Sequence, residues 1–388
     1  MVGSAEGVAE LADHLRGQPV IAFDTEFLRE KTFFPQLGLL QIADREKSWL
    51  VDPLAIPSEA MRPLAEVFTS PDVLKVAHAA EQDQECLFHD YGVLAAPLLD
   101  TSTAAALCGW GDQVGLTVVL RKSVGVVLPK MHTRADWLRR PLSEAMIEYA
   151  ALDVAYLVEA SDRLLAELDR RGRRAWALEL SARLSDPSRF EAHGEEVAKR
   201  LAAGSRLTPR EYAVLKELVK WRELRVRAAD IPRRWIAEDR TLIQLARAQP
   251  ADPAALSDFR GLNGNKKERG VREILDSIRC GLEVVDEELE EPPRKLEATA
   301  DEGPALTAFR CFLNALARDA EIPLRYLIES DTALLLLRRE FNCADELRDC
   351  GLIDEAAWKL FGDEIYAILK GKRALRLKNG RAIRFDID

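Results

Sequence analysis

Two acidic residues stand close together in an apolar segment near the N-terminus. Asp24 and Glu26 lie in the run Ala22-Phe23-Asp24-Thr25-Glu26-Phe27, whose composition favours a strand. Side chains alternate between the faces of a strand, so these two carboxylates project from one face, about 7 Å apart. Acids on an apolar strand are costly unless a cation or polar partner meets them. The alternative is a strand end whose acids point into solvent.

Two further acidic groups are predicted to lie on helices. Tyr149 and Asp153 are four residues apart in Tyr149-Ala150-Ala151-Leu152-Asp153, a spacing that stacks both side chains on one helix face. A tyrosine with a buried ring and a wet hydroxyl would explain the same pattern. Asp83 falls in the first turn of a helix after the strand VLKVAH, where the helix dipole alone favours an acid.

Taken together, these residues could serve phosphoryl chemistry. Two Mg²⁺ or Mn²⁺ ions need several oxygen ligands, and carboxylates are the ligands that proteins supply. One ion can activate the attacking water while the other steadies the leaving 3′ oxygen. A tyrosine has a pKa near 10, so Tyr149 is better suited to positioning the water than to deprotonating it.

The elements that must position these residues form an α/β pattern over 1–170. Strands are expected in PVIAFDTEF, LGLLQIAD, SWLVD and VLKVAH, and helices in EQDQECLFHDY and SEAMIEYAALDVAYLVEASDRLLAEL. From about residue 171 the strand signals stop, and amphipathic helices are expected. An acidic, Pro-containing stretch at 283–304 predicts a solvated linker.

The helical part contains an internal repeat. The segment from Ala229 to Glu238 aligns with the segment from Ala320 to Glu329, and Gly261-Leu262 corresponds to Gly351-Leu352. The period near 90 residues indicates two copies of one small helical domain rather than a solenoid.

The acidic motifs also resemble a known family. FDTEF, the HAAEQD segment ending in Asp83, and YAALD look like the three motifs of the tyrosine-containing branch of the DEDD exonucleases. The segment from Lys130 through Asp136-Trp137-Leu138-Arg139-Arg140-Pro141-Leu142 to Glu148-Tyr149-Ala150 resembles ribonuclease D. The resemblance implies metal ligands Asp24, Glu26, Asp83 and Asp153, with Tyr149 orienting the water, and RNA contacts at Lys130 and Trp137.

The resemblance also implies an architecture. We expect a ribonuclease H-like α/β exonuclease domain, with a mixed sheet and helices, at 1–170. Two all-α domains of the type called HRDC are expected at 206–284 and 304–385, joined by an acidic linker at 285–303.

The implied activity is 3′→5′ exoribonuclease hydrolysis that releases 5′-monophosphates, in tRNA 3′ maturation. Two divalent ions, Mg²⁺ or Mn²⁺, are the expected cofactors, and a monomer without a nucleotide cofactor is expected. A DNA 3′→5′ exonuclease remains an alternative because the acids do not separate RNA from DNA. A non-catalytic RNA-binding protein is a second alternative, against which the complete acid set argues.

Charge is unevenly distributed along the chain. The net charge is −10, yet residues 207–282 carry 16 Lys and Arg against 11 Asp and Glu, a net +5. Phosphate binding recruits such cations, so Arg233, Arg234, Lys266, Lys267 and Arg269 are candidate RNA contacts. A solvated helix face is the alternative. Trp235 and Tyr326 are expected to fill their domain cores, and the basic segment from Lys370 to Arg381 is a further candidate to flank RNA.

Other function classes are disfavoured. No apolar stretch is long enough to span a membrane, and the N-terminus lacks the pattern of a secretory signal, so a cytoplasmic protein is expected. The six scattered cysteines indicate free thiols. The motifs HExxH, GxxxxGK[ST] and GxSxG are absent, which argues against a zinc protease, an NTPase and a serine hydrolase.

Overall fold

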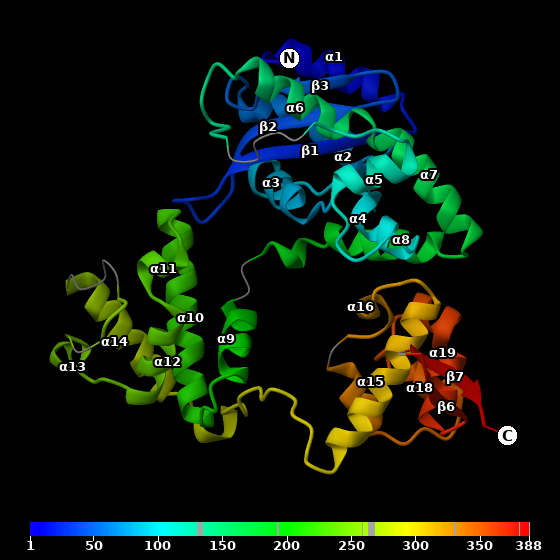
Figure 1. The fold of residues 1–388 in the computed structure, drawn as a ribbon. Helices are drawn as coiled ribbons and strands as arrows, with labels where there is room; N and C mark the ends of the chain where they lie inside the picture. The colour runs from blue at the N-terminus through cyan, green and yellow to red at the C-terminus, as the bar shows by residue number, and fades with distance from the viewer. Residues whose placement is uncertain are drawn as a thin grey trace. The chain divides into compact units, whose positions relative to one another are not determined.

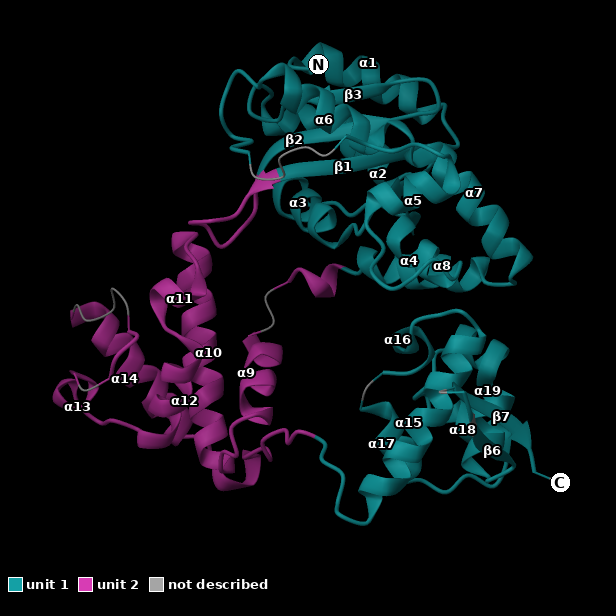
Figure 2. Ribbon diagram, in the orientation of Figure 1, with its two compact units in different colours: residues 1–26, 37–186, 296–388 teal, residues 27–36, 187–295 magenta. Residues whose placement is uncertain are grey.

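The structure, a computed structural model, describes residues 1–129, 135–191, 194–257, 259–262, 268–329, 331–379 and 381–387. The chain forms two compact units, which Figure 2 shows in separate colours. Unit 1 consists of residues 1–26, 37–186 and 296–388, and unit 2 consists of residues 27–36 and 187–295.

The N-terminal part of unit 1 is built on a mixed five-stranded sheet of order β3-β2-β1-β4-β5 (Figure 1). Strands β2 and β3 are antiparallel, whereas β4 is parallel to both β1 and β5. The strands are β1 (Val20–Leu28), β2 (Gln36–Ala43), β3 (Ser48–Val51), β4 (Leu74–Ala77) and β5 (Leu98–Asp100). The first four confirm the sequence pattern; β5 was missed because it is only three residues long.

Helices cover both faces of this sheet. They are α1 (Ala5–Arg16), α2 (Arg62–Thr69), α3 (Glu81–Tyr91), α4 (Thr101–Leu107), α5 (Leu116–Ser123), α6 (Glu144–Ala155), α7 (Leu157–Arg170) and α8 (Arg174–Ala182). Along β1, Ile21 and Phe23 enter the core that includes residues of α1 and α2. Ala22 enters the core that includes residues of α4 and α7. By alternation, Asp24 and Glu26 therefore lie on the face that Ala22 occupies.

The long helical pattern at 143–168 forms two helices rather than one. Ser143 caps α6 by accepting a hydrogen bond from the Met146 amide, and α6 ends at Ala155. Tyr156, with φ −112° and ψ 0°, separates α6 from α7. The pattern could not reveal this break, since no Pro or Gly marks it.

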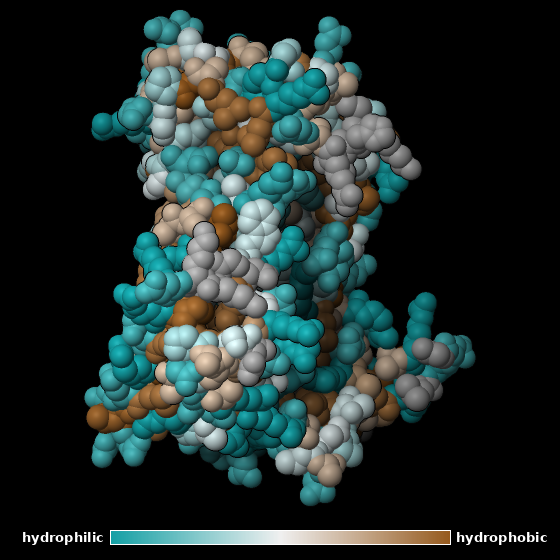
Figure 3. Space-filling model, turned by 90° about the vertical axis from the view of Figure 1, so that its left-hand side faces the viewer, coloured by the Kyte–Doolittle hydropathy of each residue, from teal (hydrophilic) through white to brown (hydrophobic). Residues whose placement is uncertain are grey.

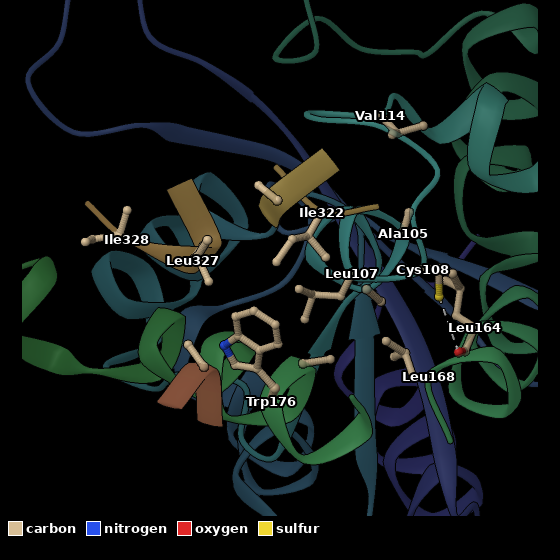
Figure 4. Close-up of a cluster of buried hydrophobic side chains, with 14 of the residues drawn as sticks. Ala105, Leu107, Cys108, Val114, Leu164, Leu168, Trp176, Ile322, Leu327 and Ile328 are labelled. Carbon is tan, nitrogen blue, oxygen red and sulfur yellow. Dashed lines mark hydrogen bonds between the residues drawn. The ribbon is translucent and has the colours of Figure 1, made fainter. Parts of the chain in front are cut away.

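The C-terminal part of unit 1 shares a hydrophobic core with the α/β part. Its helices are α15 (Glu302–Asp319), α16 (Leu324–Leu327), α17 (Thr332–Leu337), α18 (Ala344–Asp349) and α19 (Glu355–Leu369). Figure 4 shows Trp176 of α8 among buried side chains that include Leu107 and Ile322. Arg171 reinforces this packing through an ion pair with Glu321 at 2.8 Å.

The expectation of an all-α domain at 304–385 is wrong at its C-terminal end. Residues 373–386 form an antiparallel hairpin of β6 (Arg373–Lys378) and β7 (Arg381–Asp386), drawn in red in Figure 1. Its strands, Arg-Ala-Leu-Arg-Leu-Lys and Arg-Ala-Ile-Arg-Phe-Asp, mix basic and apolar residues without the strict period-two alternation by which a strand is recognised. The sequence therefore lacked a clear strand signal here.

Unit 2 consists of helices and one segment from the sheet region. Its helices are α9 (Gly194–Ala203), α10 (Pro209–Ala229), α11 (Arg233–Ile236), α12 (Asp239–Ala248), α13 (Pro253–Ser257) and α14 (Glu268–Leu282). The longest, α10, begins with a capping box in which Thr208 and Glu211 bond each other's backbone amides. Trp235 is 41% exposed, so the expectation that it fills the core is wrong.

Residues 27–36 leave β1 and pack within unit 2. Phe33 is buried in the helical core, and its amide and that of Phe34 both donate to Asp230 Oδ1 at 3.0 Å. The guanidinium groups of Arg227 and Arg233 lie 4.8 and 4.9 Å from the centre of the Phe33 ring. The segment that follows Glu26 is thus anchored to the end of α10.

Ion pairs attach part of the acidic linker to neighbouring residues. Asp286 pairs with Arg210 at 2.5 Å, and Glu290 pairs with Lys216 at 2.8 Å. These contacts hold the start of the linker against α10, where the sequence suggested only a solvated stretch.

The remaining surface features agree with the composition. All six cysteines are free, as expected. Within the described ranges, no helix combines the length and the apolar character needed to cross a bilayer. On the face drawn in Figure 3, hydrophobic residues form separate patches among hydrophilic ones.

Candidate active site

Three of the four predicted carboxylates meet at one point. Asp24 and Glu26 project from β1 and Asp153 projects from α6, and one carboxylate oxygen of each lies within 4.8 Å of the others. Asp153 is buried, while Asp24 and Glu26 are partly buried. Such a cluster of oxygen donors fits a divalent cation.

Asp83 adjoins this cluster from α3. Its Oδ1 accepts hydrogen bonds from the Thr25 amide at 3.0 Å and from the Thr25 hydroxyl at 2.5 Å. Thr25 stands between Asp24 and Glu26, so these bonds fix α3 against the acid-bearing part of β1. The sequence indicated Asp83 but gave no sign of its bond to Thr25.

The carboxylates of the cluster raise one another's pKa values. Burial raises the pKa of Asp24 well above its ordinary value, and the carboxylates of Asp83, Asp153 and Glu26 raise it further. Burial, with the charges of Asp153 and Asp83, raises the pKa of Glu26 to about 8. Burial also raises the pKa values of Asp83 and Asp153 to about 6. Like charges so close cannot all ionise without a compensating cation.

Tyr149 lies one turn before Asp153, and the two side chains influence each other's pKa. Burial, followed by the charges of Asp153 and Glu26, raises the pKa of Tyr149 above its usual range. The phenol therefore stays protonated at neutral pH. This supports a positioning role over that of a general base.

The Trp137 ring lies next to the Tyr149 ring. Their ring centres are 6.2 Å apart, and Trp137 is only 4% exposed. The expectation that Trp137 contacts RNA does not fit this placement, because its ring is enclosed by Leu39, Leu50 and Ala150. The Trp137 side chain helps to fix α6 on the sheet.

The Trp137 backbone is also held closely. A Cβ at Gly38 would lie 2.6 Å from the Trp137 carbonyl oxygen, so only glycine fits there. Arg140 donates to the Trp137 carbonyl at 2.8 Å, to the Gly38 carbonyl at 2.6 Å and to both Asp52 oxygens at 2.7 Å. Arg140 thus joins the segment before α6 to β2.

A pocket of about 460 Å³ opens beside the acids. Asp24, Tyr149 and Asp153 form its polar wall, and the remaining lining residues are His78, Leu116, Thr117, Leu128, Pro129, Leu152 and Leu157. His78 lies in this pocket lining. Its Nδ1 lies 2.9 Å from the Thr101 hydroxyl, and burial lowers its pKa, so the imidazole is neutral at pH 7.

The three predicted RNA-binding arginines have partners within the protein. Arg233 holds the buried carboxylate of Glu223 at 2.7 Å, and Arg269 pairs with Glu273 at 2.9 Å. Arg234 lies on α11 and also makes an interaction within the protein. Lys130, Lys266 and Lys267 lie outside the described residues.

Comparisons with known proteins agree with this geometry. Residues 1–169 match a family model described as a 3′-5′ exonuclease, and residues 211–278 match the HRDC domain. Ribonuclease D from Acidiphilium cryptum is 32% identical over 98% of this chain and 93% of its own length. Ribonuclease D from Gluconacetobacter diazotrophicus is 33% identical over 99% and 96%.

A solved structure is similar over nearly the whole chain. The crystal structure of Escherichia coli RNase D, described as an exoribonuclease involved in structured RNA processing, matches with a TM-score of 0.81 and 28% identity. The match covers 96% of this chain and 98% of that one.

Proposed function

Because this chain belongs to the ribonuclease D family of 3′→5′ exoribonucleases, we propose that its carboxylate cluster is the centre at which RNA 3′ ends are hydrolysed. The observation that carries this proposal is the meeting of Asp24, Glu26 and Asp153 within 4.8 Å, from a strand and a helix far apart in sequence. Their raised pKa values support a site whose charges are balanced by bound cations.

The exonuclease fold implies divalent ions, and we assign Mg²⁺ or Mn²⁺, two per site. Asp24, Glu26 and Asp153 would hold them, together with Asp83. Both bonds from Thr25 engage Oδ1 of Asp83, so Oδ2 is the oxygen that we assign to a metal. Bound ions would lower the pKa of the attacking water and balance charge on the leaving oxygen.

The remaining roles belong to side chains around the cluster. The protonated Tyr149 hydroxyl, which lines the pocket with Asp24 and Asp153, would orient the attacking water. The pocket beside the acids has the size of a small-ligand site. Its leucines and Pro129 would hold the terminal base, and the acids would face the last phosphodiester.

We propose tRNA precursors as the natural substrate and a monomer in the cytoplasm as the working form. The proposed domains are the exonuclease at 1–170, HRDC domains at 206–284 and 304–385, and a linker at 285–303. The second HRDC assignment is supported by the repeated order of a long helix, an Ile-Pro turn, a four-residue helix and further helices.

The test is a digestion of 5′-labelled RNA in Mg²⁺. The proposal predicts a ladder that shortens from the 3′ end and releases 5′-monophosphates, with no cleavage when a chelator is present. DNA of the same sequence is the control. If the protein digests the DNA as fast as the RNA, or faster, its activity is that of a DNA exonuclease instead.

A further inference from the structure

The C-terminal hairpin has two chemically different faces. Its register pairs Ala374 with Phe385, Arg376 with Ile383, and Lys378 with Arg381. Directly paired residues share one face of a hairpin, and the alternate pairs share the other. We call the face that carries these six residues the outer face.

The opposite face is attached to the helices. Arg384 donates to Asp319 of α15 at 3.1 Å and also pairs with Glu364 of α19. Arg373 pairs with Glu364 at 2.8 Å. These two arginines therefore attach the hairpin to α15 and α19.

None of the six outer-face residues is acidic, although Asp319, Glu364 and Asp386 line the hollow beside Arg381, Ile383 and Phe385. Arg376, Lys378 and Arg381 are exposed, and Ile383 and Phe385 are 44% and 40% exposed. The Arg376 guanidinium lies 5.2 Å from the centre of the Phe385 ring. Three cations beside an exposed aromatic ring thus gather on one small surface in a chain whose net charge is −10.

We propose that this outer face binds single-stranded RNA. Proteins hold single strands without sequence preference by stacking bases on aromatic side chains and placing cations at the phosphates. Phe385 would stack on a base, and Arg376, Lys378 and Arg381 would contact the backbone. This inference rests on the proposed function, for which the face supplies a grip on RNA outside the active-site pocket.

The cations and the Phe385 ring should contribute to RNA binding in different ways, so each contribution can be measured separately. The full chain is titrated with a labelled 12-nucleotide single-stranded RNA in a chelator, at several salt concentrations. Lys378→Ala with Arg381→Ala should weaken binding and reduce the slope of log K against log salt by about 1.4, or ~0.7 per phosphate contact. Phe385→Ala should weaken binding by about 5- to 150-fold, the equivalent of one stacked base, without changing the slope. Phe385→Trp should restore affinity.

Matched controls come from the same domain. Lys359 and Arg339 are exposed cations outside the hairpin sequence, and replacing both with alanine removes the same charge. The proposal is overturned if this pair weakens binding as much as the hairpin pair does, or if Phe385→Ala binds like the unmodified protein. It is also overturned if the hairpin variants keep RNA affinity but convert a dimer to a monomer in light scattering, which would make the face a self-association surface.

A short substrate separates this proposal from the proposed function. A trinucleotide engages mainly the active-site pocket, so the hairpin variants should digest it at the unmodified rate while they digest the 12-mer more slowly at limiting RNA. If the unmodified protein digests neither the trinucleotide nor the 12-mer in Mg²⁺, the proposed function is wrong. The binding titration in chelator still tests whether the outer face binds RNA.

Discussion

Asp230 and Glu321 occupy the same position in two separate helical regions, and each anchors other parts of the chain. Each stands in the left-handed conformation, with φ of 46° and 54°, at the end of a long helix and directly before an Ile-Pro turn. Asp230 accepts the amides of Phe33 and Phe34. Glu321 accepts Arg171, which follows α7. The repeated turn thus serves as a docking element in both regions.

Replacing Asp230 should loosen the segment that follows β1. Asp230→Ala removes the acceptor of two part-buried amides, which costs about 1–3 kcal/mol, and it strains a left-handed position. Hydrogen exchange at Phe33 and Phe34 should accelerate. Asp230→Asn is the matched control, since asparagine keeps an acceptor and tolerates this conformation. Unchanged exchange in the alanine variant would show that the bonds to Asp230 do not hold the segment.

Removing a proposed metal ligand should abolish hydrolysis and spare RNA binding. Loss of even an indirect metal partner typically costs 10- to 100-fold, so Asp24→Ala and Asp153→Ala should each lower kcat by more than ~100-fold. Single-turnover digestion and binding titrations measure the two effects. Asp162→Ala, which removes an exposed acid of α7 paired with Arg45, should digest RNA normally. A ligand variant that retains ordinary turnover would refute the assignment.

The stability of the metal-free protein should fall as pH rises. The pKa of Glu26 is raised from 4.5 to about 8, so between these values the folded state binds more protons than the unfolded chain. Stability then decreases with pH across this window. The Glu26→Gln variant does not have to ionise a buried carboxyl. In a chelator, its Tm should exceed that of the unmodified protein by a margin that grows from about pH 5 to pH 8.

In saturating Mg²⁺ the unmodified protein should have the higher Tm of the two, because the bound ion balances the charge of Glu26. A constant Tm difference at every pH would show that the Glu26 carboxylate is not under electrostatic strain.

Tyr149→Phe should lower kcat and leave KM nearly unchanged. The phenol is protonated through the neutral range because its pKa is raised, so its loss removes a hydroxyl that can orient the attacking water. We expect a decrease of about 10- to 100-fold, the usual effect of removing a residue that orients groups around a metal. The pH profile of kcat should keep its shape. A profile that loses its basic limb would instead identify Tyr149 as a titrating base.

The sequence predicted the acidic site well because strand and helix periods determine which side chains share a face. Asp24, Glu26 and Asp153 follow from period two and period four, and the structure brings them together. The bond from Thr25 to Asp83 joins two distant segments, which no local pattern encodes. The pocket residues Leu116 and Leu128 come from a helix and a loop whose positions depend on tertiary packing.

The fold was less predictable where local signals were ambiguous. Tyr156 interrupts a continuous helical pattern without a breaker residue, and β5 is too short to show a period. Trp235 has the composition of a core residue, yet the short helix α11 leaves it exposed. In each case tertiary contacts decided between local options that the sequence left nearly equal.

The anchoring of residues 27–36 limits how the protein can be divided for study. A fragment ending at residue 186 would retain Phe33 and Phe34 but lose Asp230 and Arg227, which bind and cover them. Two aromatic rings would then be exposed on the loop directly after Glu26, and such surfaces promote aggregation. An isolated nuclease fragment therefore needs both phenylalanines replaced by polar residues, and any activity it lost would reflect damage to its own loop as well as the missing helices.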